Sequence, residues 1–227
     1  MPSLQAVVFD LDGTLIDTVP GITRALNTVL ASTGQPALSQ AEVTRMIGDG
    51  VEMLMRRALE ARGMPADPDA LPRHTARLSE LMEEEPPAPE NLFPGVLDVL
   101  RRLDDDGVVL GVCTNKPEVP ARIALQACGL DGLIGAVVGG DTLDTRKPAA
   151  DPLLATIATL GAAPGRSVMV GDNHNDVATA RAAGVAVVAV TYGYAHGPAH
   201  ELDADVLIDH FGDLPDALAR IEARLPQ

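Results

Sequence analysis

Short apolar runs alternate along this chain with stretches of helical periodicity, and this alternation limits the fold more than any other feature. The runs are rich in β-branched residues, end at turn residues and occupy residues 6–9, 108–113, 134–138, 168–170, 185–190 and 206–208. Runs of this kind are typical of parallel strands that helices cover on both faces. Between them, apolar residues recur at helical spacing, for example in residues 96–103. The sequence therefore predicts an α/β fold built on a parallel sheet.

One long segment, residues 16–91, breaks the alternation because it shows helical periodicity only, for example in residues 51–59. The segment returns through an acidic, proline-rich stretch whose composition suits a stiff, solvated connection between two bodies. A chain of 227 residues also exceeds one minimal domain, which agrees with a core that carries an insertion. We therefore predict a discontinuous core of residues 1–15 and 92–227 and a helical cap domain of residues 16–91.

The charge balance is strongly acidic, with 17 Lys and Arg residues against 32 Asp and Glu residues and a formal net charge of −15. Such a field repels nucleic-acid backbones and anionic lipid surfaces. The sequence contains no apolar run of about 18 residues, the length that a membrane span requires, and no basic region precedes its first apolar run. We expect a cytoplasmic protein, monomeric or homodimeric, whose partner is a small metabolite and not a nucleic acid or a membrane.

Two pairs of carboxylates follow the ends of two predicted strands. Asp10 and Asp12 lie in the segment FDLDGT, and Asp172 and Asp176 lie in the segment GDNHND. A turn would explain the first pair alone, and helix capping would explain the second, but the ends of parallel strands meet at one edge of a sheet. Carboxylates this close repel each other unless a proton or a cation intervenes, and Mg²⁺ prefers carboxylate, water and phosphate oxygens. The pattern therefore predicts a magnesium site.

Both lysines of the chain, Lys116 and Lys147, lie in loops that follow predicted strands, whereas every other basic residue is arginine. Lysine offers a compact point charge to a phosphate oxygen, although a compositional drift toward arginine would give the same pattern. Thr114 and Asn115 precede Lys116 and offer a hydroxyl and an amide that suit an anionic oxygen. These residues favour an anion site beside the carboxylates.

In chain order the candidate residues are two acids, a hydroxyl with an amide, a lysine and two further acids. This order resembles the four motifs of the haloacid dehalogenase superfamily of phosphatases, with FDLDGT as the first, TN of TNK as the second, the lysine of RKP as the third and GDNHND as the fourth. The resemblance covers nearly the whole chain. It implies a Rossmann-like parallel sheet with a helical cap inserted between the first and second motifs. The segments GGDTLDTRKPAADPLL, VTYGYAHG and IGDGVEMLMRRAL further resemble those of bacterial phosphoglycolate phosphatases.

The resemblance implies a magnesium-dependent phosphomonoester hydrolase that works through an aspartyl-phosphate, with 2-phosphoglycolate as the expected substrate. Asp10 would attack phosphorus, and Asp12 would act first as an acid and then as a base. Mg²⁺ would be held by the Asp10 carboxylate, the Asp12 backbone carbonyl and the Asp172 carboxylate. Asp176 would lie behind these ligands without binding the metal.

The same resemblance implies which residues bind the transferring phosphoryl group. Lys147, which also counts among the catalytic residues, would contact the phosphoryl oxygens together with Thr114 and Asn115. Gly13 would let the backbone approach the phosphate closely.

Substrate choice would come from the cap, where the segment Gly48, Asp49 and Gly50 precedes a predicted helix and resembles a specificity loop that closes over the active site. A substrate carboxylate needs a cation or backbone donors, and Arg45 is a candidate for that cation without an assigned position. His174, within the fourth motif, receives no role.

Three alternatives remain open at this stage. A phosphatase for another small metabolite or for pyrophosphate, and a sugar-phosphate mutase of the same family, would share all four motifs. A receiver-type signalling switch also phosphorylates an aspartate beside a threonine and a lysine. The switch is disfavoured because Asp10 stands at the start of the chain and a long insertion follows it.

Overall fold

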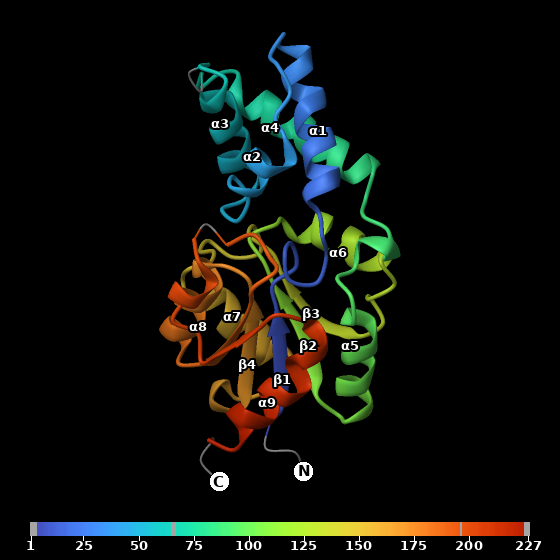
Figure 1. Ribbon diagram of the computed structural model, residues 1–227, viewed down its shortest axis with the longest axis vertical. Coiled ribbons are helices and arrows are strands. Elements are labelled where there is room, and N and C mark those ends of the chain that lie inside the picture. The colour runs from blue at the N-terminus through green and yellow to red at the C-terminus, as the bar shows by residue number, and fades with distance from the viewer. Residues whose placement is uncertain (1–3, 65–66, 196, 225–227) are drawn as a thin grey trace.

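The computed structural model describes residues 4–64, 67–195 and 197–224, and these residues form a parallel sheet between two layers of helices, with a group of helices above the sheet (Figure 1). The strands are β1 (Ala6–Phe9), β2 (Val109–Cys113), β3 (Ile134–Val138), β4 (Ser167–Gly171), β5 (Ala186–Val190) and β6 (Val206–Ile208). All are parallel, in the order β3-β2-β1-β4-β5-β6. This is the order of a doubly wound Rossmann-type sheet, so the predicted fold class is confirmed.

The strands read as apolar runs because helices cover the sheet on both sides. All four residues of the central strand β1 are buried, and their side chains alternate between the two faces. Val7 and Phe9 belong to one hydrophobic cluster, and Val8 belongs to another on the opposite face. The edge strand β6 is less covered, and its Leu207 is exposed. A polar residue on either face of β1 would lose its contact with water, which explains the unbroken apolar run.

Five helices and four short 3-10 turns accompany the strands within the described part of the core. They are η1 (Pro89–Asn91), α5 (Val96–Asp105), α6 (Glu118–Ala127), α7 (Asp151–Thr159), η2 (Pro164–Arg166), α8 (His174–Ala183), η3 (Ala199–Glu201), η4 (Phe211–Asp213) and α9 (Leu214–Glu222). Buried residues of α5, α6 and α9 share the cluster of Val7 and Phe9, whereas those of α7 and α8 share the cluster of Val8. The helices therefore form two layers around the sheet, as Figure 1 shows.

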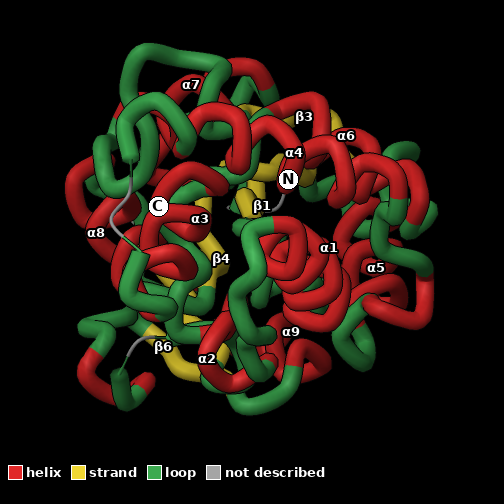
Figure 2. The backbone as a smooth tube through the Cα atoms, turned by 90° about the horizontal axis from the view of Figure 1, so that it is seen from above, coloured by secondary structure: helices red, strands yellow, loops and turns green. Residues whose placement is uncertain are grey.

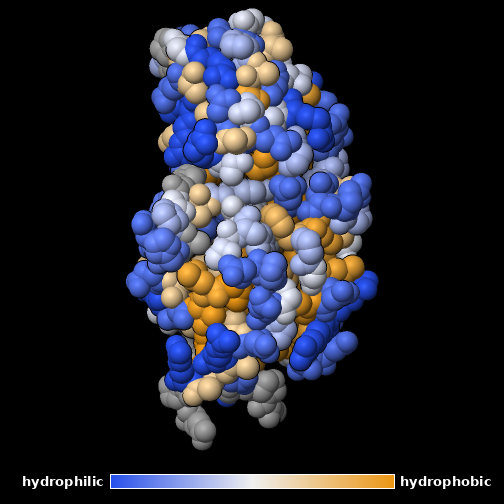
Figure 3. Space-filling model, viewed as in Figure 1, coloured by the Kyte–Doolittle hydropathy of each residue, from blue (hydrophilic) through white to orange (hydrophobic). Residues whose placement is uncertain are grey.

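The segment between β1 and α5 forms helices only and lies above the carboxyl ends of the strands, where Figure 2 shows it from above. Its helices are α1 (Val19–Ser32), α2 (Gln40–Thr44), α3 (Val51–Ala61) and α4 (Leu71–Glu84). They pack around a hydrophobic cluster of their own that contains fully buried side chains such as Leu26, Met55 and Leu78. Their outer surface is mostly hydrophilic in the view of Figure 3. None of the helices in the described residues combines the length and the apolar character needed to cross a membrane.

Two chain segments that lead into and out of this helical group lie side by side. The Asp17 amide donates to the Asn91 carbonyl at 2.8 Å, and the Phe93 amide donates to the Leu15 carbonyl at 3.1 Å. Ile16 and Leu92 form an antiparallel bridge between these bonds. The boundaries predicted for the cap, 15/16 and 91/92, fall on this pair. We propose that the pair is the hinge between the cap and the core.

Candidate active site

The candidate residues of four separate sequence segments meet at the carboxyl edge of the sheet. Asp10 directly follows β1, Thr114 follows β2 and Asp172 follows β4, and these three strands are neighbours in the sheet. Lys147 enters from the loop between β3 and α7, and Asp176 lies in the first turn of α8. All five residues are buried. The sheet order alone therefore brings together residues that are up to 166 positions apart in the chain, as for Asp10 and Asp176.

Three buried carboxylates form a cluster around one ammonium group. Ligand oxygens of Asp10, Asp172 and Asp176 lie within 4.8 Å of one another. The Lys147 Nζ lies 2.9 Å from Asp10 Oδ1 and 2.6 Å from Asp176 Oδ1. The second oxygen of Asp176 accepts hydrogen bonds from the backbone amides of Asp172, at 3.0 Å, and Asn173, at 3.1 Å. One oxygen of Asp176 thus contacts the Lys147 ammonium group, and the other accepts from two backbone amides.

Burial makes this cluster unfavourable for negative charge. It raises the pKa of Asp10 to about 6, against the attraction of Lys147 and with a further contribution from Asp176. It also raises the pKa of Asp172 well above its usual value, and the Asp176 and Asp10 carboxylates add to that effect. Burial opposes the charge of Lys147 as well, but Asp10 and Asp176 outweigh it and raise the pKa of the ammonium group. Lys147 is therefore charged, and three carboxylates face a single protein cation.

The donor set of this cluster fits a divalent metal ion. Asp10 and Asp172 offer carboxylate oxygens whose ionised forms the protein alone stabilises poorly, and a cation between them would favour those forms. An all-oxygen environment suits hard cations such as Mg²⁺, which typically bind one or two carboxylates and complete their shell with water or phosphate oxygens. The carboxylates predicted to hold a metal therefore lie where a metal would stabilise them.

Asp172 is held in place by contacts with the loop that follows β1 and the loop that follows β5. Thr14 Oγ1 donates to Asp172 Oδ1 at 3.2 Å, and the Tyr194 amide donates to Asp172 Oδ2 at 2.6 Å. Gly13 has a φ of +89°, and a Cβ at this position would lie 2.5 Å from Asp172 Oδ2. A side chain at Gly13 would displace the carboxylate, which gives this glycine a clear physical requirement.

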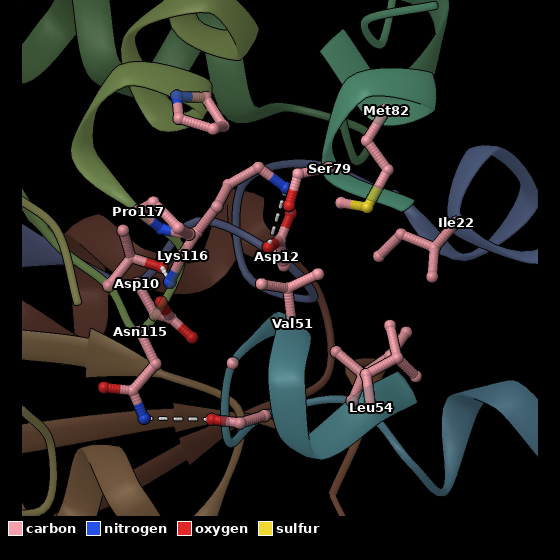
Figure 4. Close-up of a pocket in the computed structure, with 15 residues that line it drawn as sticks. Asp10, Asp12, Ile22, Val51, Leu54, Ser79, Met82, Asn115, Lys116 and Pro117 are labelled. Atoms are coloured by element: carbon pink, nitrogen blue, oxygen red, sulfur yellow. Dashed lines mark hydrogen bonds and ion pairs between the residues drawn. The ribbon is translucent and has the colours of Figure 1, made fainter. Parts of the chain in front are cut away.

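Asp12 lies outside the cluster of three carboxylates and forms an ion pair with Lys116. The Lys116 Nζ lies 3.2 Å from Asp12 Oδ2 and 3.3 Å from Oδ1, as the dashed lines in Figure 4 mark. The side chains of Lys116 and Asp12 are 9% and 15% exposed. Both line a cavity between core and cap, together with Asp10 and Thr114. The structure thus separates the two lysines, with Lys147 at Asp10 and Lys116 at Asp12.

The side-chain amide of Asn115 forms hydrogen bonds that the sequence did not predict. Its Nδ2 donates to the Gly48 carbonyl at 3.0 Å and to the Lys147 carbonyl at 3.2 Å. Phosphate binding by this amide, expected from the sequence, would require it to give up one of these bonds. In the arrangement seen here Asn115 connects the core to the cap loop, whereas Thr114 is the neighbouring residue that presents a hydroxyl at the cavity.

The cap loop of Gly48, Asp49 and Gly50 lies against the core beside the carboxylate cluster. Asn175 Nδ2 donates to Asp49 Oδ1 at 2.9 Å and to the Gly48 carbonyl at 3.3 Å. Asp49 also forms an ion pair with Arg57 of α3. These contacts place the loop over the site.

The two residues to which the sequence assigned no position lie away from the cavity lining. Arg45 is exposed at the end of α2, and His174 is exposed at the start of α8. Neither is among the residues that line the cavity between core and cap.

Asn175→Ala is expected to raise KM for the substrate about ten- to thirtyfold, because it removes two hydrogen bonds that hold the cap loop, each worth about 1 kcal/mol. Steady-state kinetics measures this. Asn27→Ala is the matched control, since Asn27 makes two hydrogen bonds with Leu38 inside the cap and touches no core residue named here. A rise in KM of equal size in both variants would contradict a specific role for the loop contact.

Sequence reasoning missed Tyr194, which follows β5 and connects the site to the hinge. Its hydroxyl donates to Asp17 Oδ1 at 2.8 Å and accepts from the Thr18 amide at 2.8 Å. Its ring is buried in the hydrophobic cluster of the cap. The segment VTYGYAHG resembles a segment of related phosphatases, but no pattern in the sequence indicates that Tyr194 contacts both Asp172 and the start of α1.

Comparison with known proteins finds relatives in sequence and solved structures of the same architecture. The sequence model of the haloacid dehalogenase-like hydrolase family matches residues 7–190 of the chain. Phosphoglycolate phosphatase from Rhodospirillum rubrum is 45% identical over 218 residues, which cover 94% of this chain and 90% of that protein. The crystal structure of a predicted phosphoglycolate phosphatase from Haemophilus somnus superposes with a TM-score of 0.89 at 30% identity, covering 96% of this chain and 99% of that one. CbbY from Rhodobacter sphaeroides, in complex with phosphate, superposes with a TM-score of 0.75 at 25% identity, covering 93% and 96%.

The sheet is doubly wound and carries carboxylates at the ends of adjacent strands. Together with the match to the family model, this shows that the chain belongs to the haloacid dehalogenase-like hydrolase family. The resemblance read from the four motifs is thereby confirmed. Within the family the chain is similar to phosphoglycolate phosphatases.

Proposed function

We propose that the protein is a magnesium-dependent phosphatase that hydrolyses 2-phosphoglycolate to glycolate and phosphate through an aspartyl-phosphate on Asp10. The placement of Asp10 carries this proposal. Asp10 follows β1, belongs to the carboxylate cluster and lines the cavity that Asp12 and Thr114 also line. The activity named for the Rhodospirillum rubrum relative supports the choice of substrate.

The residues of the site divide the reaction into two displacements. In the first, an Asp10 oxygen bonds to phosphorus, the phosphorus bond to the ester oxygen breaks, and Asp12 donates a proton to the departing glycolate oxygen. In the second, Asp12 takes a proton from water while the water oxygen bonds to phosphorus and the Asp10–phosphorus bond breaks. Both residues thereby return to their starting states, and phosphate leaves.

Other residues orient these groups and balance charge. Lys147 contacts Asp10 Oδ1 at 2.9 Å and would add positive charge beside the transferring group. Asp10 and Asp172, with the Asp12 backbone carbonyl, would hold Mg²⁺, which supplies positive charge between the nucleophile and the phosphate when it is bound. The contacts of the cap loop with Asn115 and Asn175 favour a closed arrangement that excludes bulk water.

The test is Mg²⁺-dependent phosphate release from a panel of 2-phosphoglycolate, sugar phosphates, nucleotides and pyrophosphate. We expect the highest kcat/KM for 2-phosphoglycolate. Efficient release from other esters only would contradict the substrate and keep the chemistry. Isomerisation of a sugar phosphate without release of phosphate would identify a mutase instead, and absence of turnover on every ester would contradict the proposal.

At about pH 7.5 and a concentration of about 100 times its Kd, Mg²⁺ is expected to raise the melting temperature by about 5–10 °C. The same concentration of Mg²⁺ is expected to raise it by less in acid. The pKa of Asp10 is raised from 3.8 to about 6, so the folded protein keeps a proton that the unfolded chain releases. The stabilisation that this proton gives the folded protein is complete below the pKa of Asp10 in the unfolded chain, and it is lost as the pH rises through about 6. Mg²⁺ replaces that proton, so its effect is expected to be larger at about pH 7.5 than at about pH 5.

Differential scanning calorimetry at the two pH values, with and without Mg²⁺, measures this difference. Asp172→Asn is expected to remove most of the shift at both values, because it removes one of the two carboxylates proposed to hold the ion. A shift of equal size at both pH values in the parent protein would show that the ion binds somewhere other than the carboxylate cluster.

A further inference from the structure

We propose that Lys116 binds the carboxylate of the substrate and so sets the preference of this enzyme for a phosphate ester with an anionic leaving group. The inference rests on the proposed function, because it assigns a partner to the charged end of 2-phosphoglycolate.

The cavity beside Asp10 and Asp12 offers one cation to a substrate. Its cap side is mostly apolar and includes Ile22, Val51, Leu54 and Met82, which lie to one side of Asp12 in Figure 4, whereas Ser79 lies beside the tip of Lys116. Among the described residues that line the cavity, Lys116 is the only Lys or Arg. An unpaired carboxylate in such an apolar environment is costly, so a ligand that carries one would need this ammonium group.

The position of Lys116 matches the chemistry of the substrate. Asp12 is the proposed proton donor to the ester oxygen, and Lys116 Nζ lies 3.2 Å from Asp12 Oδ2. In 2-phosphoglycolate a single methylene separates the ester oxygen from the carboxylate carbon. A substrate with its ester oxygen at Asp12 therefore carries its carboxylate into the immediate surroundings of Lys116. The phosphoryl group would meanwhile face Asp10.

The other cations near the site are engaged or lie outside the cavity. Lys147 is 2% exposed and lies between Asp10 and Asp176. Arg57 donates to the Met46 carbonyl and pairs with Asp49. Arg45, the candidate from the sequence, is exposed and does not line the cavity.

The backbone of Lys116 is held on both sides, which presents its side chain to the cavity. The Lys116 amide donates to Thr114 Oγ1 at 3.2 Å, and its carbonyl accepts from the Gly140 amide at 2.8 Å. Its only ion-pair partner in the described residues is Asp12, whose side chain is partly exposed to the cavity. A substrate carboxylate can therefore share the ammonium group with Asp12 without any movement of the backbone.

The test compares 2-phosphoglycolate with carbamoylmethyl phosphate, in which a neutral amide of nearly the same shape replaces the carboxylate. The measured quantity is the ratio of kcat/KM for the two esters in the parent protein and in Lys116→Met and Lys116→Arg. We expect the parent to prefer 2-phosphoglycolate by about 100-fold and Lys116→Met to lose that preference almost completely, through a rise in KM for 2-phosphoglycolate. Lys116→Arg keeps the cation and is expected to keep most of the preference.

The ratio does not depend on how much of each preparation is active, so a poorly folding variant still gives a valid result. If Lys116→Met slows both esters equally and keeps the ratio, Lys116 acts only on Asp12 and the inference is overturned. A parent protein that hydrolyses both esters with equal efficiency also overturns it. A parent that hydrolyses neither ester but releases phosphate from others overturns the proposed substrate, which is a separate result.

Discussion

Asp10→Asn is expected to lower the rate of phosphate release by about 10⁴-fold or more, because an amide oxygen cannot replace the carboxylate as the nucleophile. The fold should tolerate the change. Burial already disfavours the charged form of Asp10, since it raises the pKa of this group to about 6, and Lys147 keeps its contact with Asp176. The loss should therefore appear in kcat and not in the melting temperature.

Two measurements test this prediction. Rapid acid quenching with radiolabelled substrate should trap a covalent phosphoryl label on the parent protein and none on Asp10→Asn. Asp98→Asn is the matched control, because it makes the same change in charge at an exposed position in the first turn of α5. Turnover by Asp10→Asn within about tenfold of the parent would exclude Asp10 as the nucleophile and reopen the choice among the other carboxylates.

Lys147→Met is expected to lower the free energy of unfolding of the metal-free protein by about 3–5 kcal/mol, which is the cost of leaving buried charges without their partner. The ammonium group is 2% exposed and lies within 2.9 Å of Asp10 Oδ1 and 2.6 Å of Asp176 Oδ1. Its removal leaves two buried carboxylates facing each other without a cation between them. The rate of phosphate release should fall by about 10²- to 10³-fold, because the transferring group also loses this charge.

Urea denaturation with and without Mg²⁺ measures the change in stability. Mg²⁺ should restore part of it, because the ion binds the same carboxylates. The double variant Lys147→Met/Asp176→Asn should be more stable than Lys147→Met alone, since it removes one of the unpaired charges, yet it should remain slow. A double variant that loses the sum of the two single effects would show that repulsion between the carboxylates is not the source of the instability.

Most of the fold was predictable because each strand carries its own signal. The strand predicted at residues 108–113 is β2 (Val109–Cys113), and the strand predicted at residues 168–170 is β4 (Ser167–Gly171). Central strands of a doubly wound sheet are buried on both faces, so nearly every residue must be apolar and the run stands out against the helical periods. The order of the strands is not visible in any one run, and it came from the structure.

The candidate site likewise contains contacts that the sequence predicted and contacts that it did not. The close approach of Asp172 and Asp176 was predictable because Asp172 lies in the short connection before α8 and Asp176 lies in the first turn of that helix, only four residues later. The contacts of Asn175 with Asp49 and of Lys116 with Asp12 join residues 126 and 104 positions apart. The first pair depends on how the cap lies on the core, and the second depends on the pairing of β1 with β2, so no local pattern in the sequence encodes either distance.

The sequence by itself determined the type of sheet, the position of the helical insertion and the chemical groups that gather at the strand ends, because burial and helical spacing act on neighbouring residues. Only the tertiary structure decided the pairing of those groups. It placed Lys147 between Asp10 and Asp176, and Lys116 beside Asp12 in the cavity. It also turned the Asn115 amide toward the cap loop. These assignments depend on the order of the strands and on the docking of the cap, which set distances between segments that are remote in the chain.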